Sequence, residues 1–168
     1  MTELALDELE GGASFGCGNP LSMSEVGTGD VVLDLGSGAG LDLLLAARLV
    51  GPTGRVIGVD MTGDMIERAR ANIDAAGFSD FVEVREGLIE ALPVPDASVD
   101  HVISNCVINL SPDKDAVFAE IARVLKPGGR VSISDIVAKD LPEAVRNDAL
   151  FHASCIGGAI AEEDYAAG

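Results

Sequence analysis

A glycine-rich turn is the stretch of this sequence whose residue types and spacing point most directly to chemistry. An apolar stretch at residues 31–35, which Asp34 interrupts, precedes the turn, and an apolar run that begins at Leu41 follows it (VVLDLGSGAGLD, residues 31–42). The residues of the turn are Gly36, Ser37, Gly38, Ala39 and Gly40. Glycines let the backbone approach a ligand closely and adopt dihedral angles that a Cβ atom would block. The turn therefore predicts a binding site for a small molecule.

The spacing around the turn narrows the kind of ligand. The third glycine, Gly40, comes one residue earlier than the G-x-G-x-x-G pattern of dinucleotide sites requires. The carboxylate of Asp34 would repel a pyrophosphate and attract a cation. Asp60 ends the next apolar stretch, about 20 residues past the turn, where a carboxylate can accept hydrogen bonds from both ribose hydroxyls. Together these residues indicate a nucleoside that carries a positive charge.

The three cysteines, Cys17, Cys106 and Cys155, are the other residues that could do chemistry. Their odd count and wide, irregular spacing are not typical of a disulfide framework. Free cysteines are most often small buried hydrophobic residues, and that interpretation stays open for each of the three. Cys17 and Cys155, however, lie in glycine-rich stretches, and Cys106 lies at the end of a predicted strand, two residues past its last residue. If the three thiols converge, they would suit a soft, thiophilic centre better than a hard cation such as magnesium.

Apolar stretches alternate with breakers in a pattern that predicts strands and helices in turn. Strands are expected at residues 31–35, 55–59, 81–85, 99–104 and 130–136, with helices at 41–50, between Thr62 and Gly77, and at 113–125. The breaker KPGG at residues 126–129 is expected to end the last of these helices. Such alternation predicts an α/β fold with a doubly wound, mostly parallel sheet and helices on both faces.

Residues that directly follow the strands are the candidates for contact with a ligand, because ligands of such sheets lie beyond the carboxyl ends of the strands. Met61 follows Asp60 and could pack on the face of an adenine ring, with Leu88 and Ile89 on its other face. Asn105 follows the fourth predicted strand at the same edge. Ordinary core packing is the alternative for the three apolar residues.

Composition excludes several classes of partner. The chain has 168 residues, with 11 Lys and Arg against 28 Asp and Glu, for a formal net charge of −17. Nucleic acid and anionic membranes need a basic surface, so neither is expected. The acidic residues 1–10 lack the parts of a signal peptide, and the most apolar run, residues 41–50, is too short to span a membrane. One domain, in the cytoplasm, is therefore expected.

Six motifs make the chain resemble a known family. They are GCGNP at residues 16–20, DLGSGAGLD at 34–42, VIGVDMT at 56–62, SNCVINLSPDK at 104–114, RVLKPGGR at 123–130 and ASCIGGAI at 153–160. Through them the chain is similar to the arsenite methyltransferases, a family of class I S-adenosylmethionine-dependent methyltransferases. Many methyltransferases share the glycine turn and KPGG, whereas the three cysteine-bearing motifs are distinctive.

The resemblance implies a Rossmann-like methyltransferase sheet and S-adenosylmethionine as the cofactor, bound by the turn, Asp60 and the residues at the strand ends. It implies that residues 31–168 form this domain and that residues 1–30 are an extension with a cysteine-bearing loop. It also implies that Cys17, Cys106 and Cys155 hold trivalent arsenic during catalysis, delivered as arsenite or as a thiol conjugate of arsenite. A thiol reductant is the implied partner.

Members of this family continue well past residue 168, with further strands after the fifth. The resemblance therefore implies a C-terminally short domain that lacks the last strands, and an open sheet edge invites pairing with a second copy of the chain. Two other functions stay open. One is a small-molecule methyltransferase of the quinone type, in which the cysteines are incidental, and the other is a non-catalytic module that binds the nucleoside or arsenic.

Overall fold

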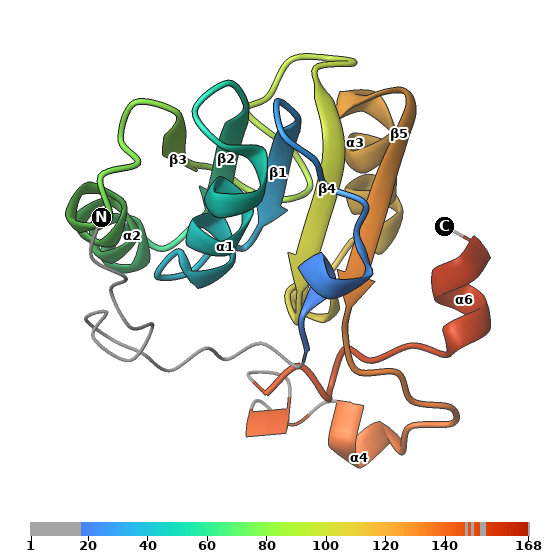
Figure 1. Cartoon of the computed structure of the whole chain (residues 1–168). Coiled ribbons are helices and arrows are strands. Elements are labelled where there is room, and N and C mark those ends of the chain that lie inside the picture. Colours follow the sequence, from blue (N-terminus) through green and yellow to red (C-terminus); the bar gives the residue numbers. More distant parts are fainter. Residues whose placement is uncertain (1–17, 147, 149, 152–153, 168) are drawn as a thin grey trace.

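One parallel sheet organises the molecule (Figure 1). The computed structural model describes residues 18–146, 148, 150–151 and 154–167. The strands are β1 (Val31–Leu35), β2 (Arg55–Asp60), β3 (Val82–Glu86), β4 (Val99–Asn105) and β5 (Leu125–Ser134), in the order β3-β2-β1-β4-β5. The strand order reverses between β1 and β4, which is the switch point where ligands bind in such sheets. The predicted Rossmann-like α/β fold is confirmed.

Helices cover both faces of the sheet (Figure 1). Helices α1 (Leu41–Val50) and α2 (Gly63–Ala75) pack on one face, and α3 (Lys114–Val124) packs on the other. The shorter elements are the 3₁₀ turns η2 (Pro20–Met23) and η3 (Ile108–Leu110) and the helices α4 (Glu143–Arg146) and α6 (Glu162–Ala167). The turn η2 lies against β4, β5 and α1.

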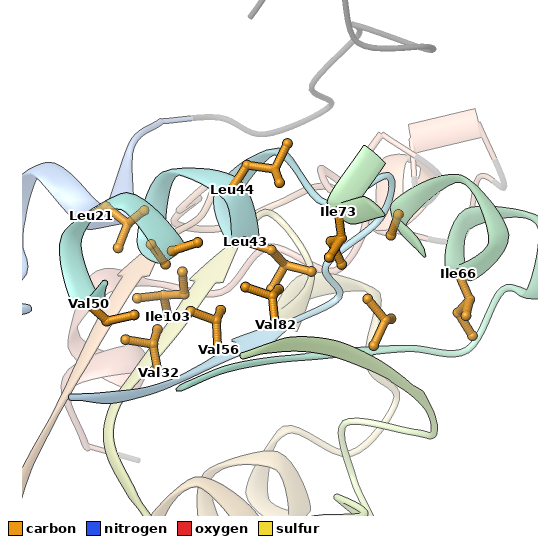
Figure 2. Close-up of a cluster of buried hydrophobic side chains, with 14 residues drawn as sticks. Leu21, Val32, Leu43, Leu44, Val50, Val56, Ile66, Ile73, Val82 and Ile103 are labelled. Carbon is orange, nitrogen blue, oxygen red and sulfur yellow. The ribbon is translucent and has the colours of Figure 1, made fainter. Parts of the chain in front are cut away.

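The central strands bury side chains on both faces, which explains their nearly continuous apolar sequences. Val32, Val56 and Ile103 face Leu43 and Ile73 of the first pair of helices, as Figure 2 shows. The residues on the opposite face form a second cluster with α3; among them are Leu33, Leu35, Val102, Val117 and Ile121. Two packed cores therefore hold the carboxyl ends of the strands in fixed positions.

The start of β5 differs from the prediction. The sequence predicts a strand from residue 130, with residues 126–129 as a stop, but β5 begins at Leu125, directly after α3. Its pairing with β4 shifts register, because Val99 pairs with Leu125 whereas His101 pairs with Arg130. An irregularity of this kind absorbs extra residues without ending the strand.

The segment after β5 passes the carboxyl ends of the strands, where α4 lies (Figure 1). It ends in α6, whose Tyr165 ring meets the ring of Phe118 on α3 edge to face, with 6.1 Å between the centroids. In the described sheet β5 is an edge strand. Pairing of this edge with a second copy stays a prediction.

Candidate active site

The glycine turn adopts the backbone conformation that its residues predict. Gly36, Gly38 and Gly40 have φ angles of 66°, 52° and 89°, in the left-handed region that favours glycine. A Cβ atom on Gly36 would overlap the side chain of Val107, whereas one on Gly38 would meet no atom within 4 Å. Gly36 therefore permits close packing inside the protein, and Gly38 faces open space that a ligand can occupy.

Asp60 connects the glycine turn to the end of β2. Its Oδ2 accepts a hydrogen bond from the Gly38 amide at 2.9 Å, and its Oδ1 accepts one from the Thr62 amide at 2.9 Å. Each carboxylate oxygen has a second lone pair, so both can still accept a hydroxyl proton. The predicted contact with a ribose is compatible with this geometry and stays a prediction.

Asp34 is a buried carboxyl group beneath the turn, with 2% of its surface exposed. Burial raises its pKa well above the usual value, and the charges of Asp42 and Asp60 raise it further. Three carboxylates so close to one turn favour a cationic ligand, because a cation would stabilise their charged forms. This electrostatic environment agrees with the predicted charged nucleoside and disagrees with a pyrophosphate.

Ser37 sits in the turn above Gly58 of β2, where a Cβ atom would lie 2.6 Å from the serine hydroxyl. This hydroxyl is buried and has no hydrogen-bond partner among the described residues. A buried polar atom without a partner is uncommon in folded proteins. The predicted role of Ser37 in holding a ligand is one explanation, and it stays a prediction.

The three apolar residues predicted to surround an adenine ring differ in exposure. Met61 is 69% exposed and Leu88 49% exposed at the carboxyl ends of β2 and β3. Ile89 is 9% exposed and belongs to the core cluster beneath α3, and its contact with an adenine ring stays a prediction. Met61 and Leu88 are therefore the accessible apolar surfaces for a flat ring.

Asn105 joins the N-terminal segment to the edge of the glycine turn. Its Nδ2 donates to the Gly18 carbonyl at 2.9 Å and to Asp42 Oδ2 at 3.0 Å, and its Oδ1 accepts from the Gly18 amide at 3.3 Å. The side chain therefore has a structural role that the sequence did not predict. Cys17, the neighbour of Gly18 in the sequence, lies outside the described residues.

The structure brings Cys106 and Cys155 together although they are 49 residues apart in the sequence. The Cys155 thiol donates to the Cys106 carbonyl oxygen at 2.7 Å, and both residues are buried. Their φ angles are 56° and 63°, in a region that costs about 1–3 kcal/mol for a residue other than glycine. Such strain occurs mainly at functional sites, where the surrounding structure maintains it.

Two polar residues near Cys155, Asn109 and Tyr165, were not predicted from the sequence. Asn109, Asp135 and Tyr165 form a hydrogen-bonded group next to the Cys155 loop. Burial raises the pKa of Cys155, and the charge of Asp135 raises it further. No local pattern indicates Asn109 in η3 or Tyr165 in α6, whereas Asp135 directly follows β5 at the edge where ligands of such sheets lie.

Among the described residues, no group of three or more His, Cys, Asp or Glu side chains could hold a metal ion. The predicted three-thiol site includes Cys17, so this finding does not test it. A polar cavity of about 320 Å³ lies at the opposite, amino ends of the strands, where His101 pairs with Asp30 and Lys126 with Asp100. This cavity is remote from the glycine turn.

A comparison with known proteins assigns this chain to a family. A family model described as a methyltransferase domain matches residues 27–167. This chain belongs to that methyltransferase domain family. The cofactor of the domain is S-adenosylmethionine, and the open turn, the three carboxylates and the exposed Met61 and Leu88 fit its charge and its adenosine.

The relatives of this methyltransferase domain confirm the resemblance to arsenite methyltransferases. It is 52% identical to the arsenite methyltransferase of Halobacterium salinarum, over 89% of this chain and 38% of the relative. It is 44% identical to that of Aquipseudomonas alcaligenes, over 90% of this chain and 45% of the relative. The domain therefore spans less than half the length of these relatives.

A solved structure supports the same relation. The arsenic (III) S-adenosylmethionine methyltransferase from Chlamydomonas reinhardtii matches with a TM-score of 0.80 and 41% identity, over 90% of this chain and 53% of that chain. No helix in the described part of the domain has the length and apolar character needed to cross a membrane.

Proposed function

We propose that this domain transfers a methyl group from S-adenosylmethionine to trivalent arsenic held by the thiolates of Cys17, Cys106 and Cys155. The observation that carries the proposal is the contact between the two described cysteines at the carboxyl edge of the sheet. Val107, the residue after Cys106, packs on Gly36, so the cysteine turn and the glycine turn touch. The names of the relatives support arsenite as the substrate.

The position of Gly18 supports the inclusion of Cys17. The backbone of Gly18 is hydrogen-bonded to the side chain of Asn105, and Asn105 directly precedes Cys106 in the sequence. A Cβ atom on Gly18 would overlap the Ser134 side chain, and the Cys106 amide donates to the Ser134 carbonyl at 2.8 Å. The chain on the C-terminal side of Cys17 is therefore held next to Cys106.

The residues of the domain supply position and electrostatics in this reaction. Asp34 and Asp60 would stabilise the cationic cofactor, and Met61 and Leu88 would contact its adenine ring. S-adenosylmethionine, when bound, supplies a sulfonium methyl group that the arsenic lone pair can attack, with the electron pair of the broken carbon–sulfur bond remaining on sulfur. No protein base is needed, because the arsenic lone pair carries no proton. Alignment of two bound reactants can lower a barrier by about 7–11 kcal/mol.

Arsenite would be loaded by exchange of its three hydroxyl groups for three cysteine thiols. Each arsenic–sulfur bond forms as one thiol proton leaves with one hydroxyl group as water, so the exchange is balanced. Methyl transfer raises arsenic from the trivalent to the pentavalent state. Return to the trivalent state needs two electrons, for which a thiol reductant is the proposed source.

X-ray absorption at the arsenic edge tests this proposal by counting sulfur neighbours. We expect three sulfur atoms around arsenic in the unmodified protein, and weaker arsenite binding in Cys17→Ser, Cys106→Ser and Cys155→Ser with unchanged affinity for S-adenosylmethionine. Leu49→Ser, at a residue 43% exposed on α1, is the control and should bind arsenite normally. Fewer than three sulfur neighbours in the unmodified protein would contradict the shared site.

The two alternative functions give different results. A methyltransferase of the quinone type would keep its activity in all three Cys→Ser variants. A non-catalytic module would bind arsenite and the cofactor without forming a methylated product. The contact between Cys155 and Cys106 favours arsenic over a quinone, because a quinone site does not require two cysteines to meet.

We also propose that residues 1–30 form an extension and that the methyltransferase domain begins at residue 31. A thiol reductant is the proposed partner, and β5 is the proposed surface for self-association. The cytoplasm stays the proposed compartment, because ligation of arsenic would need all three cysteines in the reduced state, which a reducing compartment maintains.

A further inference from the structure

Asn109 is a fully buried polar side chain next to the cysteines, and the proposed function does not use it. It lies in η3, three residues after Cys106. Its Nδ2 lies 2.7 Å from Ile136 O, 2.8 Å from Asp135 Oδ1 and 3.0 Å from Cys155 O, so its two hydrogens are shared among three acceptors. One side chain therefore connects the chain after β5 to the Cys155 loop.

Tyr165 determines which way the Asn109 amide points. The Tyr165 hydroxyl lies 2.5 Å from Asn109 Oδ1 and 3.2 Å from Asp135 Oδ2. Burial raises the pKa of Tyr165, and the charge of Asp135 raises it further, so the phenol keeps its proton and acts as a donor. The amide oxygen of Asn109 must therefore face Tyr165, and the amide nitrogen must face the Cys155 loop.

The Cys155 loop packs directly on the backbone of Asn109. A Cβ atom on Gly158 would overlap the Asn109 carbonyl oxygen, so only glycine allows this approach. On the same loop, the Cys155 thiol reaches the Cys106 carbonyl at 2.7 Å. The loop is therefore held from two sides, by the amide of Asn109 and by the turn that contains Cys106.

We propose that Asn109 is a positioning residue of the arsenic site, which keeps Cys155 in its left-handed conformation with the thiol directed at Cys106. The inference rests on the proposed function. A residue other than glycine stays in the left-handed region only when its surroundings impose it, and the Asn109 amide is the side chain that bonds to the Cys155 backbone. Residues that orient the ligands of a metal typically change its affinity by about 10- to 100-fold when they are replaced.

The test compares Asn109→Ala with the unmodified chain by arsenite titration and by X-ray absorption at the arsenic edge. We expect arsenite affinity to fall by about 10- to 100-fold, and the sulfur count to fall from three to two, because Cys155 is released. Asn72→Ala is the matched control. Asn72 is also buried, and its side-chain amide donates to the backbone carbonyl of Ala39 at 3.0 Å, which lies in the glycine turn and not in a cysteine loop.

Tyr165→Phe is a second variant that removes a single oxygen atom. It keeps the ring that packs on Phe118 and removes the donor that orients the Asn109 amide. We expect a smaller loss of arsenite affinity in the same direction. If Asn109→Ala does not fold, Tyr165→Phe tests the positioning role of Asn109. Unchanged arsenite affinity and three sulfur neighbours in Tyr165→Phe would then overturn the inference.

The outcomes separate the inference from the proposed function. Fewer than three sulfur neighbours in the unmodified protein would contradict the proposed function, and this inference with it. Three neighbours and unchanged affinity in Asn109→Ala would overturn only the positioning role. An equal loss of affinity in Asn72→Ala would also overturn that role, since general destabilisation would then explain both results.

Discussion

The buried carboxyl group of Asp34 shows how a single residue can be set for a charged ligand. In the folded chain its pKa is raised by burial and by the charges of Asp42 and Asp60. A cation bound beside the turn would counteract the repulsion from Asp42 and Asp60, and would therefore lower the pKa of Asp34. The energetic cost of keeping Asp34 charged in the interior is thus offset only when a positive ligand is bound.

Asp34→Asn should weaken cofactor binding while it stabilises the domain. The raised pKa means that the folded state binds this proton more tightly than the unfolded state, so the contribution to stability is complete below the usual pKa of 3.8 and is lost as the pH rises through the folded value. Asp34→Asn has no ionisable group at this position and therefore does not lose this stability as the pH rises, so its melting temperature at neutral pH should be higher than that of the unmodified protein. Calorimetry should show S-adenosylmethionine affinity lower by about tenfold or more, or about 1.4 kcal/mol.

Glu67→Gln is the control for the Asp34 variant, because it removes the same charge from an exposed position on α2. It should leave the affinity for S-adenosylmethionine unchanged. If Asp34→Asn bound the cofactor as tightly as the unmodified protein, the electrostatic role of this carboxyl group would be wrong.

At the scale of elements, the turn between β1 and α1 combines two kinds of glycine. Gly36 is needed inside the protein, where it leaves room for Val107, and Gly38 is needed at the surface that faces open space. Both have positive φ angles, so both would be strained by a side chain. The two glycines differ in packing, because only Gly36 lies against another side chain, that of Val107.

Gly36→Ala should therefore destabilise the domain more than Gly38→Ala. Strain in the left-handed region costs about 1–2 kcal/mol in either variant. The overlap with Val107 adds about 1–3 kcal/mol in Gly36→Ala alone. Urea unfolding measures both values, and calorimetry should show that Gly38→Ala loses cofactor affinity while it remains folded. Equal unfolding free energies for the two variants would contradict this division of roles.

At the scale of the whole molecule, β5 forms one of the two edges of the described sheet, and it is the edge proposed for self-association. Exposed edges of sheets offer unpaired backbone groups to another strand, and a charged side chain on the edge discourages this. Val131 on β5 is 46% exposed. The net charge of −17 opposes association in general, so any pairing must come from a specific surface.

Sedimentation velocity should show that this chain associates as its concentration rises, and Val131→Lys should reduce the association. Leu49→Lys adds the same charge to an exposed apolar position on α1 and should leave the association unchanged. A monomer at all concentrations would show that the β5 edge is not an association surface for this chain.

The sequence by itself determined the elements and the glycine turn, because these depend on neighbouring residues. The helix at residues 41–50 was predicted to the residue, since Gly40 and Gly51 flank an apolar run, and the structure has it as α1. The acid at Asp60 was predicted from its distance to the turn. The predicted start of β5 was wrong because KPGG, which typically ends a helix, is accommodated as an irregularity in the register between Leu125, which pairs with Val99, and Arg130, which pairs with His101.

Only the tertiary structure decided which residues meet at the site. The hydrogen bonds of Asn109 reach residues 26 to 56 positions away, so no periodic pattern could indicate them. The same holds for the thiol of Cys155 at the Cys106 backbone, 49 positions apart. Ile89 joined the core and Met61 stayed exposed for a similar reason, since α3 covers one face of the sheet and leaves the carboxyl end of β2 open. Local sequence determines backbone conformation, whereas contacts across the sheet arise only when the two cores pack.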